Sequence, residues 1–89
     1  MNPVEFTRDL EAAGFVEIGE SDFAPRARPV DHEHPFDVAG LVLSGAFVIA
    51  RGEDVVDYGP GQRFDVAKGE IHSEWMGPQG AKVVIGRRY

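Results

Sequence analysis

Asp31-His32-Glu33-His34-Pro35-Phe36-Asp37 holds two of the three histidines of this 89-residue chain, one residue apart. In an extended strand, side chains at positions i and i+2 point to the same face. Both imidazoles then leave the backbone in one direction, as two nitrogen ligands of a divalent metal ion do. The third histidine, His72, has to be brought to them by the fold. The stretch therefore predicts strands that meet around a metal site.

The amino end of the chain has the pattern of a single helix over residues 2–14. Asn2 can cap this helix, Pro3 suits its first position, and Glu5 stands where a reciprocal capping partner belongs. Gly14 is the expected stop. Apolar residues at helical spacing form one stripe, at Phe6, Leu10 and Ala13. We expect this helix to pack against a sheet.

After the helix, short apolar runs alternate with turn residues about every ten positions. Ser44-Gly45 is predicted to be a tight hairpin between strands at 41–43 and 47–50. Residues 77–80, which read Gly-Pro-Gln-Gly, are predicted to turn into a last strand at 81–85. Further strands are expected at 15–18, 55–58, 63–66 and 71–76. About eight short strands in this rhythm indicate an antiparallel sandwich or barrel.

One segment before the histidines lacks this rhythm. Pro25 and Pro29 bracket Arg26-Ala27-Arg28. Proline cannot donate a hydrogen bond to a sheet, so the segment is predicted to be irregular or to lie at a sheet edge.

Two groups of residues resemble the two sequence motifs of the cupin superfamily, a family of small β-barrels. His32, His34 and Gly45 fit the first motif, and Gly61, Gly69 and His72 fit the second with the family's spacing. The resemblance covers about residues 27–86. The chain departs from the family's glycine, glutamate, proline and asparagine at Arg26, Val38, Ala67 and Met76 respectively.

The resemblance implies an all-β fold: a small antiparallel jelly-roll barrel, also called a double-stranded β-helix, with one N-terminal α-helix. It implies a single domain over residues 1–89, with the barrel at about 15–87. His32, His34 and His72 would be metal ligands inside the barrel, and Phe36 and Met76 would line a pocket. Because Val38 replaces the family glutamate, a fourth ligand has two candidates, Asp37 and Glu74.

Composition restricts the class of partner. The net charge of −6 argues against binding to nucleic acid. The absence of cysteine excludes disulfides, and the absence of a long apolar run argues against a membrane span. The first residues do not read as a secretory signal, so a cytoplasmic protein is expected. A chain of this length buries a thin core, and open sheet edges invite pairing, so a homodimer is also expected.

The predicted function is that of a small cupin that binds Fe(II), Mn(II), Ni(II) or Zn(II) and binds or turns over a small molecule. Two alternatives stay open at this point: a non-catalytic sensor or ligand-binding module, and a structural barrel without metal. Neither the substrate nor a catalytic residue follows from the sequence, and whether the protein is an enzyme is left open.

Overall fold

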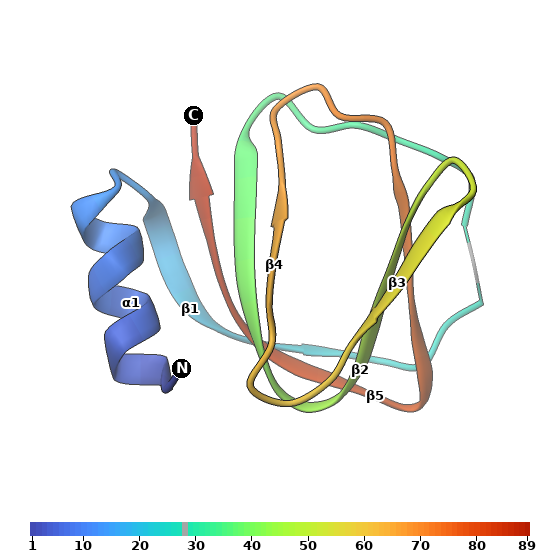
Figure 1. The fold of residues 1–89 in the computed structure, drawn as a ribbon, viewed down its shortest axis with the longest axis horizontal. Coiled ribbons are helices and arrows are strands. Elements are labelled where there is room, and N and C mark those ends of the chain that lie inside the picture. Colours follow the sequence, from blue (N-terminus) through green and yellow to red (C-terminus); the bar gives the residue numbers. More distant parts are fainter. Residues whose placement is uncertain (28) are drawn as a thin grey trace.

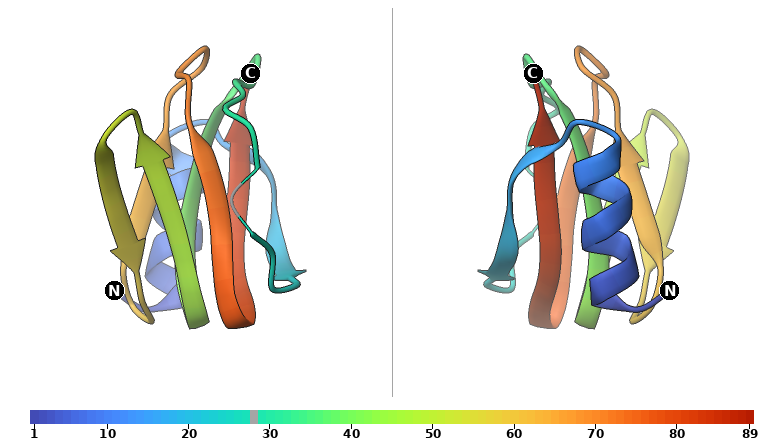
Figure 2. Two further views of the ribbon diagram at one scale, coloured as in Figure 1. Left: turned by 90° about the vertical axis from the view of Figure 1, so that its right-hand side faces the viewer. Right: turned by 90° about the vertical axis from the view of Figure 1, so that its left-hand side faces the viewer.

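Two antiparallel layers make up the protein, with one helix on the outside of one layer (Figures 1 and 2). The computed structural model describes residues 1–27 and 29–89. Within these residues the elements are α1 (Pro3–Ala12), β1 (Val16–Phe23), β2 (Asp37–Arg51), β3 (Asp54–Tyr58), β4 (Arg63–Val66) and β5 (Ser73–Arg88). The described strands pair in the order β1-β5-β2-β3, with β4 also paired to β2, and the sheet does not close on itself. The expected all-β jelly-roll fold with one N-terminal helix is confirmed.

The helix begins as predicted. The side chain of Asn2 accepts a hydrogen bond of 2.9 Å from the backbone N–H of Glu5, and Pro3 occupies the first turn. Phe6 and Leu10 are fully buried against the sheet. The helix ends at Ala12, earlier than predicted, so Ala13 is its exposed C-cap rather than part of the buried stripe.

The predicted hairpin at Ser44-Gly45 is wrong, because β2 runs through it as one strand of 15 residues. Register shifts on both sides of this point bend the strand. Gly45 has a φ of 77°, and a Cβ there would lie 2.1 Å from the carbonyl oxygen of Gly80. Only glycine allows both the positive φ and this close approach.

The predicted turn at residues 77–80 is wrong for the same reason, because β5 is continuous over 16 residues. Gly80 has a φ of 68°, and a Cβ there would lie 2.3 Å from the carbonyl oxygen of Phe23. Figure 1 shows β2 and β5 passing along the bottom of the molecule from the layer beside α1 to the other layer. Two bent strands thus replace four predicted short ones.

Two apolar clusters hold the layers. One lies under the helix and contains Phe6, Leu10, Phe15, Ala39, Leu41 and Val84. The other fills the space between the layers and contains Val38, Val42, Phe47, Ile49, Phe64, Val66, Met76, Ala81 and Val83. Four members of the second cluster, Val38, Phe47, Phe64 and Val66, line one cavity together with His34 and His72.

The segment predicted to be irregular, between Pro25 and Pro29, is described only in part, because Arg28 lies outside the described residues. Arg26 makes an isolated bridge to Met76 of β5. Residues 29–36 lead across the top of the molecule (Figure 1), and within them His32 pairs with His72, which directly precedes β5.

Candidate metal centre

A pair of backbone hydrogen bonds joins the two histidine segments. His32 and His72 form an isolated antiparallel bridge, in which each N–H donates to the other residue's carbonyl oxygen, at 2.8 and 2.9 Å. Residues directly opposite in an antiparallel pair place their side chains on the same face. The rings of His32 and His72 therefore lie together, with centroids 4.5 Å apart.

Two further side chains complete the group. The ring of His34 lies 5.1 Å from that of His32 and 5.2 Å from that of His72, measured between centroids. Glu74 lies two residues after His72 and on the same face, so its carboxylate points at the imidazoles. One donor atom from each of His32, His34, His72 and Glu74 lies within 4.8 Å of the others.

The hydrogen bonds of His72 decide which of its nitrogens carries a proton. Its Nδ1 lies 2.9 Å from the carbonyl oxygen of Glu70, which can only accept, so Nδ1 is an N–H donor. In the neutral ring, Nε2 then carries a lone pair. Nε2 lies 2.8 Å from a carboxylate oxygen of Glu74, which is also an acceptor. Two facing acceptors need a cation between them, either a proton or a metal ion.

His32 repeats this arrangement more loosely. Its Nδ1 lies 3.3 Å from the carbonyl oxygen of Val30, and its Nε2 lies 3.3 Å from the other carboxylate oxygen of Glu74. Backbone carbonyls that hold Nδ1 in this way orient metal-binding histidines and leave Nε2 for the ion. Arg26 also contacts Glu74, at 3.6 Å, and so fixes the carboxylate from outside.

The surroundings of His34 favour its neutral form. Burial lowers its pKa, and the nearby charge of His72 lowers it further. Its ring stacks on Phe36 at 5.1 Å with an interplanar angle of 12°. A neutral imidazole in a fixed orientation is the form that binds a metal ion.

The group fits a divalent ion in both size and chemistry. Nitrogen and oxygen donors sit about 2.0–2.2 Å from such an ion, so two donors on one ion are at most about 4.4 Å apart. A shift of a few tenths of an ångström brings the present spread of 4.8 Å into that range. Three imidazoles and one carboxylate suit the first-row divalent metals.

A cavity of about 140 Å³ adjoins the group. Its polar lining is His34, His72, Glu74 and Arg87, and its apolar lining includes Phe23, Phe36, Val38, Phe47, Phe64 and Val66. Phe36, one of the two predicted pocket residues, is part of this lining. Met76, the other predicted pocket residue, is packed in the core cluster between the layers and not in this lining. Val38 fills the position of the family's glutamate with an apolar wall.

Asp37, the other candidate for a fourth ligand, is placed away from the histidines. One of its oxygens accepts the backbone N–H of Lys68 at 2.8 Å, and the other binds the Arg88 guanidinium at 3.0 Å. These two hydrogen bonds and the nearby charge lower the pKa of Asp37. Both oxygens are therefore occupied by partners that a metal ion would have to displace.

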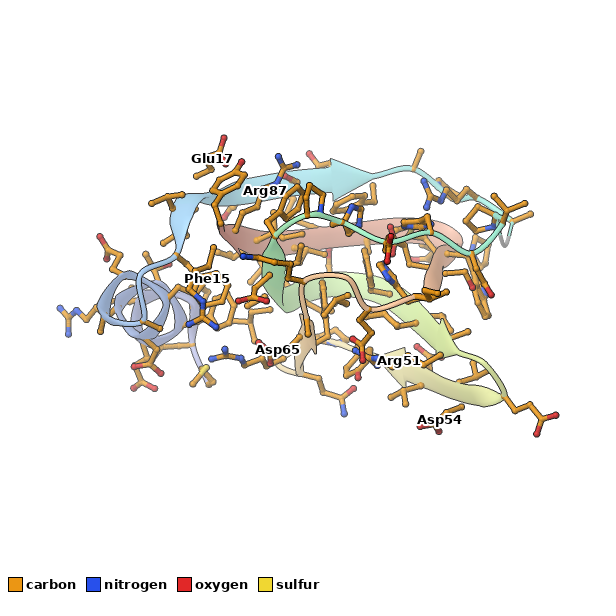
Figure 3. The ribbon with its side chains drawn as sticks, turned by 90° about the horizontal axis from the view of Figure 1, so that it is seen from above. Phe15, Glu17, Arg51, Asp54, Asp65 and Arg87 are labelled. Carbon is orange, nitrogen blue, oxygen red and sulfur yellow. The ribbon has the colours of Figure 1, made fainter. Side chains whose placement is uncertain are left out.

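The sequence reasoning did not single out Arg87, which lines the cavity near β1, on the far side of the barrel from Arg51 (Figure 3). Arg63, the arginine of β4, pairs with Asp65 at 2.9 Å and lies over Phe6 of the helix. The pairing of β5 with β2 places Arg87 opposite Val38, and that pairing cannot be read from the sequence.

No protein-family model and no curated protein matches this sequence. In fold, the chain is similar to a cupin-2 domain-containing protein from Shewanella frigidimarina, with 22% identity and a TM-score of 0.66 over 81% of this chain and 69% of that one. It is also similar to a protein with a double-stranded β-helix domain from Klebsiella pneumoniae, with 20% identity and a TM-score of 0.62 over 80% and 64%.

A third similar structure is the polyketide cyclase RemF from Streptomyces resistomycificus, with 23% identity and a TM-score of 0.64 over 84% of this chain and 55% of that one. The chain thus spans between 55% and 69% of the length of these three proteins. Together with the two antiparallel layers, these likenesses show that the chain has the fold of the cupin superfamily. The described residues contain no helix that could span a membrane.

Proposed function

We propose that this protein binds a divalent metal ion through His32, His34, His72 and Glu74, and that it binds or turns over a small molecule in the adjoining cavity. The observation that carries the proposal is the pair of facing acceptors, Nε2 of His72 and the carboxylate of Glu74, at 2.8 Å. A metal ion between them satisfies both groups at once. Fe(II), Mn(II), Ni(II) and Zn(II) all accept such donors.

Each residue of the group has a distinct part in this proposal. The carbonyl oxygens of Glu70 and Val30 hold the rings of His72 and His32, and stacking on Phe36 holds His34. The apolar wall of the cavity keeps bulk water away from one side of this group of ligands. A bound ion would supply Lewis acidity to an oxygen of the small molecule. That one protein of similar fold is a polyketide cyclase makes turnover a reasonable first test.

Metal-dependent melting tests the proposal, with a matched control that the chain itself provides. Glu33 stands between the two histidines but is exposed and outside the group. Saturating metal at a hundred times its Kd stabilises the folded state by about 2.7 kcal/mol. In a domain of this size, that raises Tm by about 10–20 °C.

We expect this rise in wild type and in Glu33→Gln, and a much smaller rise in Glu74→Gln at the same metal concentration. If metal raises the Tm of the two variants equally, Glu74 is not a metal ligand. No rise in wild type with any of the four metals would contradict the proposal as a whole.

We also propose that two copies of the chain form a homodimer. Both β1 and β3 lie at open ends of the described strand order, so each offers unpaired backbone groups. Val16 of β1 and Val55 of β3 are about half exposed, at 49% and 50%. A short chain gains stability by covering such edges.

A further inference from the structure

Arg87 faces the cavity because of its place in the sheet. It lies directly opposite Val38 in the pairing of β5 with β2, and residues so paired share a face. Val38 lines the cavity, and so does Ile85, two residues before Arg87 on the same strand. The next residue, Arg88, points to the other face and pairs there with Asp37 at 3.0 Å.

Arg87 differs from the other described arginines of the barrel in having no acidic partner. Carboxylates within 4.0 Å neutralise Arg26, Arg51, Arg63 and Arg88. Among the described residues, no carboxylate lies that close to Arg87, whose guanidinium instead lies 4.7 Å from the centre of the Phe36 ring. The residue opposite Arg87 on β2 is Val38, which has no carboxylate to pair with the guanidinium. A cation at the mouth of an apolar cavity is thus available to an anion.

The cavity limits the size of the ligand body. Its volume of about 140 Å³ is close to that of an apolar protein cavity of about 150 Å³ that accepts benzene. Phe23, Phe47 and Phe64 give its apolar lining an aromatic character. One ring or a branched chain of similar size fills such a space, and a fused pair of rings does not.

These observations assign a class of ligand. We infer that the cavity takes a small carboxylic acid whose apolar body is about the size of a benzene ring, and that Arg87 pairs with its carboxylate. The inference rests on the proposed function, since the body of this acid lies beside the metal ligands His34, His72 and Glu74. Arg87 acts here as a specificity-determining residue, outside the metal group.

Benzoate and benzyl alcohol test this inference, because they have the same ring and differ in charge. Their Kd values are measured by NMR titration at pH 7 on wild type, Arg87→Gln, Arg87→Lys and Lys82→Gln, each with and without zinc. Lys82 is the matched control, because it is an exposed cation on the same strand and is not in the cavity lining. Bound zinc is measured on the same samples.

We expect wild type and Lys82→Gln to bind benzoate about tenfold more tightly than benzyl alcohol. Arg87→Gln should lose this preference, and Arg87→Lys should keep most of it. Absence of saturable benzoate binding in wild type, or an unchanged preference in Arg87→Gln, overturns the inference. A preference that depends on zinc and not on Arg87 also overturns it, because the metal then holds the carboxylate.

The zinc measurement separates this inference from the proposed function. A sample that binds no zinc but discriminates through Arg87 supports the ligand class and contradicts zinc as the metal of the site. A sample that binds zinc through the histidines without preferring benzoate supports the metal site and contradicts the ligand class.

Discussion

Replacing Gly80 by alanine tests whether β5 bends where the structure places the bend. Gly80 has a φ of 68°, a conformation that costs alanine about 1–2 kcal/mol. The new Cβ would also lie 2.3 Å from the carbonyl oxygen of Phe23, at the end of β1. Relieving that overlap means moving backbone, which adds about 1–3 kcal/mol.

Gly52 is the control, since it has nearly the same φ, 63°, with nothing within 4 Å of a Cβ. We expect Gly80→Ala to lower the free energy of unfolding by about 2–5 kcal/mol. Gly52→Ala should lower it by about 1–2 kcal/mol. The whole chain has about 4–13 kcal/mol of stability, so urea denaturation separates these values. Equal losses in the two variants would refute the close approach of β5 to β1.

Two other properties can be tested on the same protein. The Lys68 N–H and the Arg88 side chain lower the pKa of Asp37 in the folded state. The carboxylate therefore contributes stability above its ordinary pKa of 3.8, and this contribution is lost as pH falls through the folded-state pKa. Asp37→Asn should be less stable than wild type at pH 7 and equally stable at low pH. Urea midpoints across this range check it, and a difference that does not change with pH would count against it. Light scattering at micromolar concentration should give twice the chain mass of 9.7 kDa; a mass of 9.7 kDa at every concentration would exclude the proposed homodimer.

The fold class could be predicted because local signals agree with it. The helix cap at Asn2 holds in the structure, the residues after the helix form strands, and the motif residues led to the correct superfamily fold. The number of strands could not be predicted. A glycine that ends one strand and a glycine that lets a long strand bend, such as Gly45, look alike in sequence. Only the nearby carbonyl of Gly80 distinguishes them, and it lies far along the chain.

The candidate site was predictable to the same extent. The i, i+2 spacing placed His32 and His34 together, and the glycine motif identified His72 as their partner. The sequence could not decide between Asp37 and Glu74, because the partner of Asp37 is Arg88, 51 residues away. It also could not distinguish Arg87 from Arg88, since the strand pairing decides which of them faces the cavity.

Metal content of the purified protein tests the central claim most directly. The protein should be prepared without a histidine tag or chelator, supplied with Fe(II), Mn(II), Ni(II) or Zn(II), desalted and subjected to elemental analysis. We predict one ion per wild-type chain and almost none in His72→Ala, because His72 is 1% exposed and its Nε2 faces the carboxylate of Glu74. A wild type with no stoichiometric metal, or a His72→Ala variant with full occupancy, would contradict the account.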